Sequence, residues 1–135
     1  MKVGCPKEIK AQEFRVGLTP AAVNELVRRG HFVTIETNAG QGAGFVDSDY
    51  EKEGADIVGS AKEVFDKADM IVKVKEPQAI ERKMLKSGQL LFTYLHLAPD
   101  PEQTHDLIDS GCTAIAYETV TDLNGGLPLL APMSE

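Results

Sequence analysis

The chain contains no tryptophan, only two cysteines and no long apolar run. Cys5 and Cys112 lack the spacing of metal ligands and are too few for a disulfide framework. We therefore expect two reduced core cysteines, with a reactive thiol as the rarer alternative. No apolar segment approaches the roughly 18 residues of a membrane span, and the opening MKVGCPKEIK is too polar for a signal peptide. The sequence predicts a cytoplasmic protein outside the membrane.

The chain also lacks any cluster of positive charge. Its 14 Lys and Arg residues are scattered among 21 Asp and Glu residues, which gives a formal net charge of -7. Nucleic acids and anionic membranes attract clustered basic residues, so neither is expected as a partner. The sequence predicts no metal site either. A length of 135 residues is typical of one domain with a real hydrophobic core.

Short apolar runs alternate with amphipathic segments along the whole chain. Runs typical of strands cover residues 1–4, 31–36, 56–58, 69–74, 90–95 and 113–117. Capping residues and closing glycines predict helices after Thr19, Ser48 and Ser60, a weaker one up to about Lys86, and one from Pro101 to Ser110. Strands that alternate with helices favour parallel pairing through crossovers. The predicted fold class is therefore α/β, with a doubly wound, mostly parallel sheet flanked by helices.

The stretch QLLFTYLHLAPD, from Gln89 to Asp100, places a histidine at a strand end. Leu90 to Leu95 read as a strand buried on both faces, and the run stops at His96. Ligands of open α/β sheets bind at the carboxyl ends of the strands. His96 is therefore a candidate functional residue, although a histidine at this place can also be an ordinary polar residue at a strand exit.

Two cations are expected at the same edge of the sheet. Lys75 follows the strand 69–74, and Arg15 lies in the loop before the first helix. Neighbouring parallel strands expose their carboxyl ends on one rim, so these side chains can converge with His96. Together they suit an α-keto or α-amino acid, which needs cations for its carboxylate and an acid-base group at the reacting carbon. A solvated lysine at the rim is the competing interpretation.

The glycine-rich segment NAGQGAGF, residues 38–45, follows a predicted strand and resembles a nucleotide-binding loop only superficially. A dinucleotide fingerprint needs a third glycine where Phe45 stands and a helix directly after it. We interpret the segment as a structural loop, with a phosphate or substrate contact as the alternative. The sequence also contains no Walker-type loop, so we expect no cofactor-binding residues in this chain.

Five segments together resemble the amino-terminal part of the alanine dehydrogenase family: KEIKAQEFRVGLTP, MIVKVKEPQ, LLFTYLHLAP, IAYETV and LPLLAPMSE. The resemblance implies reversible deamination of L-alanine to pyruvate and ammonia with NAD. It implies that Arg15 and Lys75 bind the substrate, with Lys75 and His96 as catalytic residues and His96 in proton transfer. Tyr94, Glu118 and Met133 are implied as neighbours of the cleft without an assigned role.

The resemblance also implies a domain organisation. Residues 1–127 would form the substrate-binding domain, and residues 128–135, where Pro132, Ser134 and Glu135 resemble a helix start, would begin a linker to an NAD-binding domain. The chain alone is then expected to be inactive. By the same resemblance, the parent enzyme is a homo-oligomer, in that family a hexamer.

Other interpretations remain at this point. Nicotinamide nucleotide transhydrogenase has a similar amino-terminal layer, but lacks the lysine and histidine that stand here as Lys75 and His96. Saccharopine dehydrogenase shares a KEP-like turn, with flanking sequence that is less similar. A third alternative is an oligomerisation or regulatory module without catalysis. The sequence leaves open the physiological direction of the reaction and how strict the cofactor preference is.

Overall fold

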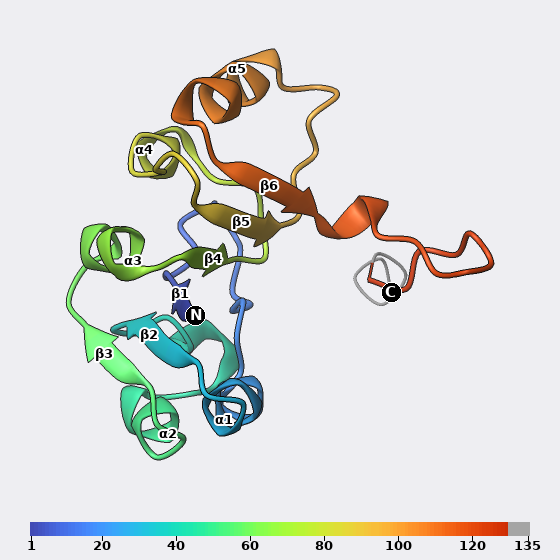
Figure 1. Ribbon diagram of the computed structural model, residues 1–135. Helices are drawn as coiled ribbons and strands as arrows, with labels where there is room; N and C mark the ends of the chain where they lie inside the picture. Colours follow the sequence, from blue (N-terminus) through green and yellow to red (C-terminus); the bar gives the residue numbers. More distant parts are fainter. Residues whose placement is uncertain (130–135) are drawn as a thin grey trace.

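A six-stranded parallel sheet forms the centre of the computed structural model, which describes residues 1–129 (Figure 1). Its order is β3-β2-β1-β4-β5-β6, and every neighbouring pair is parallel. The strands are β1 (Lys2–Cys5), β2 (Phe32–Glu36), β3 (Asp56–Val58), β4 (Met70–Val72), β5 (Leu90–Thr93) and β6 (Thr113–Ala116). The predicted doubly wound α/β fold is confirmed.

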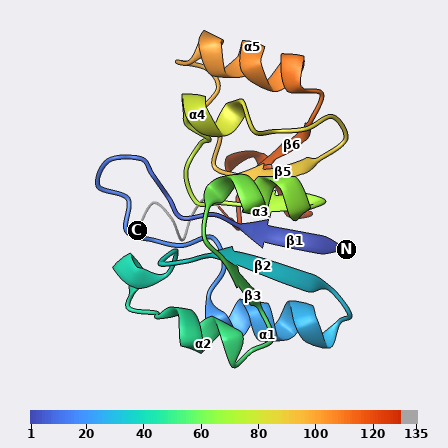
Figure 2. The same cartoon turned by 90° about the vertical axis from the view of Figure 1, so that its left-hand side faces the viewer.

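The helices are α1 (Pro20–Arg28), α2 (Asp47–Glu51), α3 (Ala61–Lys67), α4 (Ala79–Arg82) and α5 (Pro101–Ser110), with short 3-10 turns η1 (Gln41–Ala43) and η2 (Tyr117–Thr119). Figures 1 and 2 show α1 beside α2 at one end of the sheet and α4 beside α5 at the other. Two hydrophobic clusters cover the two faces. One contains Val23 of α1 and Tyr50 of α2, whereas the other contains Phe65 of α3 and Leu107 of α5.

Most predicted helix starts are confirmed by their capping contacts. The side chains of Thr19, Ser60 and Asp100 accept hydrogen bonds from backbone N–H groups in the first turns of α1, α3 and α5. The predicted cap at Ser48 is wrong, because α2 already begins at Asp47. There the Asp49 carboxylate accepts the Val46 N–H at 2.9 Å, so an acidic side chain satisfies the exposed amide.

The strand ends differ from the prediction. Regular structure in β4 stops at Val72 and in β5 at Thr93, before the predicted ends at residues 74 and 95. The segments that follow β4 and β5 still pair beyond those points, since the Tyr94 N–H donates to the Val74 carbonyl at 3.1 Å. The expectation that residues 113–117 form a buried strand is wrong: β6 pairs with β5 at the edge of the described sheet, and its first three residues are exposed.

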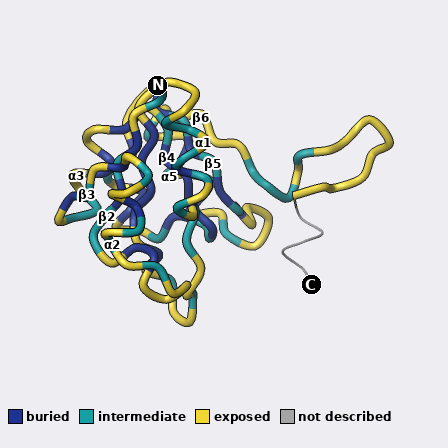
Figure 3. Tube along the Cα trace, turned by 90° about the horizontal axis from the view of Figure 1, so that it is seen from below, coloured by how far each residue is buried: buried dark blue, intermediate teal, exposed yellow. Residues whose placement is uncertain are grey.

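The cysteines and the last described residues complete the fold. Cys5 is fully buried and burial raises the pKa of its thiol to about 12, whereas Cys112 is half-buried; both are free. Within residues 1–129, no helix has the length and apolar character needed to span a membrane. After η2 the chain extends away from the sheet as an exposed arm with a turn near Gly125 (Figure 3). The predicted helix start at Pro132 lies outside the described residues, as does Met133.

Candidate active site

The candidate site lies at the carboxyl ends of β1, β4 and β5. In this strand order β1 and β4 are neighbours at the point where the winding of the sheet reverses, which is where open α/β sheets bind ligands. Arg15 lies in the loop after β1, Lys75 follows β4 and His96 follows β5. The topology therefore brings all three predicted residues to one rim.

Arg15 and Lys75 meet in a small cleft. Its lining consists of Arg15, Val74, Lys75 and Tyr94, and its volume is about 60 Å³. The Lys75 ammonium nitrogen lies 5.3 Å from the centre of the Tyr94 ring, within the range of a cation–π contact. A cleft of this size suits a molecule of only a few heavy atoms, since pockets for larger ligands measure about 300 to 1,000 Å³.

His96 lies next to this cleft and not in its lining. Its ring is 4.4 Å from the ring of Tyr94, centre to centre, and Tyr94 lines the cleft together with the two cations. His96 is exposed. Glu118, predicted only as a neighbour, accepts hydrogen bonds from the backbone N–H groups of Leu95 and His96, both at 3.0 Å. The contact of Glu118 is thus with the histidine's backbone.

Glu13 holds the Arg15 side chain, a contact that the sequence analysis missed. Arg15 Nε donates to Glu13 Oε2 at 2.9 Å and Nη2 donates to Oε1 at 2.7 Å. This hydrogen bonding keeps the pKa of the Glu13 carboxyl below its ordinary value. A guanidinium has five N–H donors, and this pair uses two of them. The other donors of Arg15 can bind a second carboxylate.

Two glycines let the Arg15 loop approach its surroundings. A Cβ at Gly17 would lie 2.7 Å from the Val72 carbonyl oxygen at the end of β4, and one at Gly42 would lie 2.7 Å from the Phe14 carbonyl oxygen. Only glycine fits such close backbone contacts. The glycine-rich loop therefore packs against the loop that carries Arg15, in agreement with its interpretation as a structural loop.

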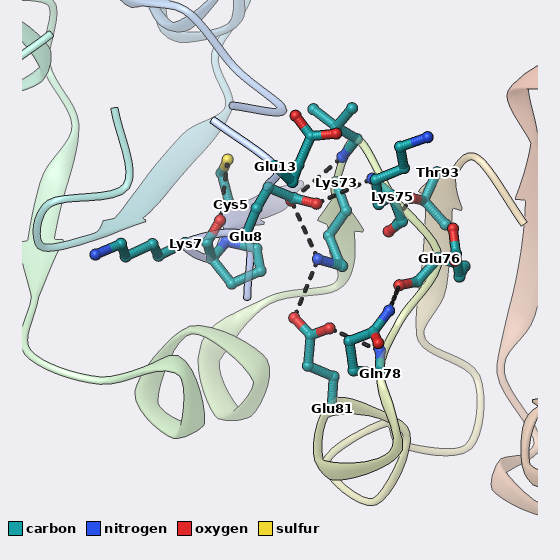
Figure 4. A network of polar contacts seen from close by, with 12 residues as sticks. Cys5, Lys7, Glu8, Glu13, Lys73, Lys75, Glu76, Gln78, Glu81 and Thr93 are labelled. Carbon is teal, nitrogen blue, oxygen red and sulfur yellow. Dashed lines mark hydrogen bonds and ion pairs between the residues drawn. The ribbon is translucent and has the colours of Figure 1, made fainter. Parts of the chain in front are cut away.

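The backbone of Lys75 is fixed by Glu8. Glu8 Oε1 accepts the Lys75 N–H at 2.9 Å, while Oε2 accepts the Val74 N–H at 3.3 Å and the Lys73 ammonium at 3.1 Å (Figure 4). On the other side, the Thr93 hydroxyl donates to the Lys75 carbonyl at 2.9 Å. Both peptide groups that flank the Lys75 side chain are thereby anchored, one to the loop after β1 and the other to the end of β5.

Lys73 is the centre of a buried ion triad that we define as Glu8, Lys73 and Glu81. Its side chain is 1% exposed, and its ammonium lies 3.1 Å from Glu8 and 3.0 Å from Glu81. Burial opposes the charge, but attraction to the two carboxylates outweighs it and raises the pKa of Lys73. Burial also raises the pKa of Glu81, since one cation cannot fully offset two buried carboxylates.

The sequence held one signal for this triad. Lys73 interrupts the apolar run MIVKV of a strand, and a buried lysine requires a partner. Its partners were not identifiable, because Glu8 is 65 positions away in the chain. Within residues 1–129, no group of three or more His, Cys, Asp or Glu side chains is arranged to hold a metal ion.

The family model for the alanine dehydrogenase/PNT N-terminal domain matches residues 4–135. The chain belongs to this family. It is 56% identical over 134 residues to alanine dehydrogenase from Halomonas elongata and 55% identical over 135 residues to alanine dehydrogenase from Mycobacterium tuberculosis. The two matches cover 99% and 100% of this chain, respectively, and 36% of each relative. The chain thus spans about a third of the length of these relatives.

Solved structures agree with the family assignment. An L-alanine dehydrogenase structure superimposes with a TM-score of 0.96 and 57% identity, covering 99% of this chain and 37% of that one. A transhydrogenase from Sinorhizobium meliloti superimposes with a TM-score of 0.85 and 30% identity, covering 92% and 35%. Both branches of the family share the fold, and this chain is far more similar in sequence to the alanine dehydrogenases.

We predict that Lys73→Met lowers the free energy of unfolding at pH 7 by about 3 to 5 kcal/mol, because it leaves two buried carboxylates without their cation. Burial already raises the pKa of Glu81, and loss of the cation should raise that pKa further, so stability should recover as the pH falls toward 4.5, the ordinary glutamate value. Urea denaturation at several pH values measures both effects.

The matched control is Lys62→Met. The side chain of Lys62 is 76% exposed and pairs with Asp66 on the surface, so no comparable loss of stability is expected. A Lys73→Met variant with the stability and pH dependence of the control would show that the triad does not stabilise the fold.

Proposed function

We propose that this chain is the amino-terminal catalytic part of an NAD-dependent alanine dehydrogenase, which converts L-alanine reversibly to pyruvate and ammonia. The observation that carries the proposal is the cleft shared by Arg15 and Lys75, in a chain 55% to 57% identical to alanine dehydrogenases. In the proposed organisation, residues 1–127 bind the substrate and residues 128–135 begin the connection to an NAD-binding domain.

The proposed roles follow from the chemistry of the side chains. Arg15 binds the substrate carboxylate through the guanidinium donors that Glu13 leaves unused, and Lys75 donates to the carboxylate or carbonyl oxygen. Tyr94 lines the cleft and contacts both Lys75 and His96. His96 accepts and returns the proton that moves at the substrate nitrogen and carbon. Glu118 acts on the backbone of His96, and Met133 remains a proposed neighbour outside the described residues.

We propose that the dinucleotide binds outside the described residues, because their glycine-rich loop lacks the features of a nucleotide-binding loop. The glycine-rich loop packs against Phe14 and Tyr50, and the helix that follows has five residues and begins only at Asp47. In this proposal NAD is bound by the other domain and supplies the hydride acceptor. This chain contributes substrate orientation, charge at the carboxylate and proton transfer. We further propose that the whole enzyme is a cytoplasmic homo-oligomer, a hexamer as in the resembling family.

A transhydrogenase-like domain is the second candidate, supported by the superposition with the Sinorhizobium meliloti protein. A non-catalytic oligomerisation module is a third. Sequence identity favours the first proposal, since it is 30% to that transhydrogenase and 57% to the L-alanine dehydrogenase structure. The reaction itself separates the three candidates.

A substrate and cofactor screen on the full-length protein tests the proposal. We expect NADH formation that depends on L-alanine, and NADH consumption with pyruvate and ammonia, both followed by absorbance. The 135-residue chain alone should show neither activity nor a calorimetric isotherm with NAD. Hydride exchange between nicotinamide nucleotides without alanine turnover would instead identify a transhydrogenase.

For the cations we predict that Arg15→Ala and Lys75→Ala each lower kcat/KM for alanine at least tenfold. Losing a charge-assisted partner of a carboxylate costs roughly 1.5 to 3 kcal/mol. Arg15→Lys should also be impaired, because a point charge cannot replace a bidentate fork. Steady-state kinetics measures these losses, with exposed Lys83→Ala as the control that keeps activity. Near-normal kcat/KM in Lys75→Ala would remove Lys75 from the site.

For His96 we predict that His96→Ala lowers kcat roughly 10²- to 10⁴-fold, the usual contribution of a general acid or base. NAD affinity should stay nearly unchanged, because the proposed cofactor site is in another domain. His96→Asn should not restore the rate, since an amide donates a hydrogen bond but does not exchange a proton.

The pH dependence of kcat provides the second measurement on His96. In the parent enzyme, alanine oxidation should fall on the acid side as the essential base becomes protonated. This decline should disappear or move in His96→Asn. If His96→Asn keeps a near-normal rate and the same decline of kcat at acid pH, His96 is excluded as the proton-transfer group.

A further inference from the structure

His96 has a backbone conformation that is uncommon outside glycine. Its φ is 51°, in the left-handed region that residues with a Cβ seldom adopt. Such a conformation persists only where the surrounding structure imposes it. The peptide groups beside His96 must therefore be held by contacts strong enough to oppose relaxation.

Two side chains from outside the loop make those contacts. From η2, the Glu118 carboxylate accepts the N–H groups of both Leu95 and His96 at 3.0 Å. From α5, Gln103 Nε2 donates to the Leu95 carbonyl at 2.8 Å. The N–H and carbonyl of Leu95 and the N–H of His96 are thus bound to residues that lie further along the chain.

Gln103 is a polar side chain in the interior of the protein. Its side chain is fully buried, and its Oε1 has no hydrogen-bond partner within residues 1–129. A buried amide oxygen without a partner is costly, so the presence of this side chain in the interior calls for an explanation. Its own N–H donates to Asp100 Oδ1 at 3.1 Å, so one residue holds both the start and the end of the segment 95–100.

We propose that Gln103 and Glu118 are positioning residues that clamp the Leu95–His96 peptide and so hold the His96 imidazole against Tyr94 beside the cleft. This proposal rests on the proposed function, in which His96 transfers the proton. The clamp acts only through the backbone of the histidine. The proposal assigns a role to Gln103, which belongs to no recognised sequence motif. It also gives Glu118 a role that requires no contact with substrate.

The physical reason for such a clamp is the exposure of His96. An exposed side chain on a loop samples several rotamers and backbone states, whereas proton transfer needs a donor and acceptor within hydrogen-bond reach. Fixing the backbone at two points reduces the states that the imidazole can adopt. Loss of one point should lower the fraction of productive geometries and leave binding by Arg15 and Lys75 intact.

The first test is Gln103→Met in the full-length enzyme. The side chain keeps its length but loses the donor to Leu95. We expect kcat for alanine oxidation to fall roughly ten- to hundredfold, the size of effect that a misplacement of about 1 Å produces. KM for alanine and for NAD should change less than about twofold, on the same reasoning that binding is unaffected.

The matched control is Gln89→Met. Gln89 is also a buried amide, and its Nε2 donates to the Phe65 and Ala68 carbonyls at 2.8 Å each, at the amino end of β5 and away from the site. It should lose thermal stability to a similar degree and keep kcat. Equal losses of kcat in both variants would show a general effect on the fold and overturn the clamp.

A second arm uses Glu118 in case Gln103→Met does not fold. Glu118 is only half-buried, so Glu118→Ala should disturb the fold less than a change at a buried residue. It removes the acceptor for the two N–H groups and should lower kcat over the same range with KM unchanged. Glu118→Gln keeps one acceptor oxygen for the two N–H groups and should recover part of the rate. If Glu118→Ala keeps the parent kcat, the clamp is wrong.

The decisive measurement combines the clamp with the histidine. If Gln103 acts through His96, then Gln103→Met should cause no further loss of kcat in a His96→Asn background. Multiplied losses would overturn the proposal. A His96→Asn enzyme with a normal rate would refute the proposed role of His96 itself, and the clamp with it. A slow His96→Asn enzyme beside a normal Gln103→Met enzyme would refute the clamp alone.

Discussion

The arrangement of the candidate site depends on the ion pairs that the buried ammonium of Lys73 makes with Glu8 and Glu81. The ammonium joins the end of β4 to α4 through Glu81 and to the loop after β1 through Glu8, which is 65 positions away in the chain. Removing charges from water is costly, so hydrogen bonds to the remaining acceptor positions stabilise such a triad. Here the backbone N–H groups of Val74, Lys75 and Gln78 bind the carboxylates, whereas Glu81 Oε2 has the ion pair with Lys73 but no hydrogen-bond partner within residues 1–129.

This arrangement has a consequence for function. The same carboxylate that neutralises Lys73 also binds the Lys75 N–H, so the core determines the direction in which Lys75 leaves the sheet. Arg15 is oriented in a comparable way by Glu13, and His96 by Glu118. Each group proposed to touch substrate is therefore fixed by a residue that is not proposed to touch it. Such support is what holds reactive groups within the narrow tolerance that catalysis requires.

The glycines at positions 17 and 42 add a steric element to this electrostatic one. They allow the Arg15 loop to lie directly on the end of β4 and beneath the glycine-rich loop. The segment that most resembled a nucleotide-binding loop thus packs against the loop that carries Arg15. A glycine spacing that fails the dinucleotide fingerprint is still informative, because close backbone contact is a second reason for glycine.

The sequence by itself determined the elements and the class of the sheet. The apolar periods, the caps at Thr19, Ser60 and Asp100 and the closing glycines are local signals, so α1, α3 and α5 begin where predicted. Parallel pairing followed from the alternation of strands and helices, and it placed Arg15, Lys75 and His96 on one rim. The family was also recognisable from short motifs that lie along the chain.

Only the tertiary structure decided which residues support those three. Glu8 and Lys73 of the triad are more than sixty positions apart. The clamp on His96 exists because the fold brings Gln103 and Glu118 to the same peptide group. The exposure of β6 and the early end of regular structure in β4 and β5 likewise depend on neighbours. Periodicity and capping are set by adjacent residues, whereas the partner of a buried charge or a strained peptide is set by packing between distant ones.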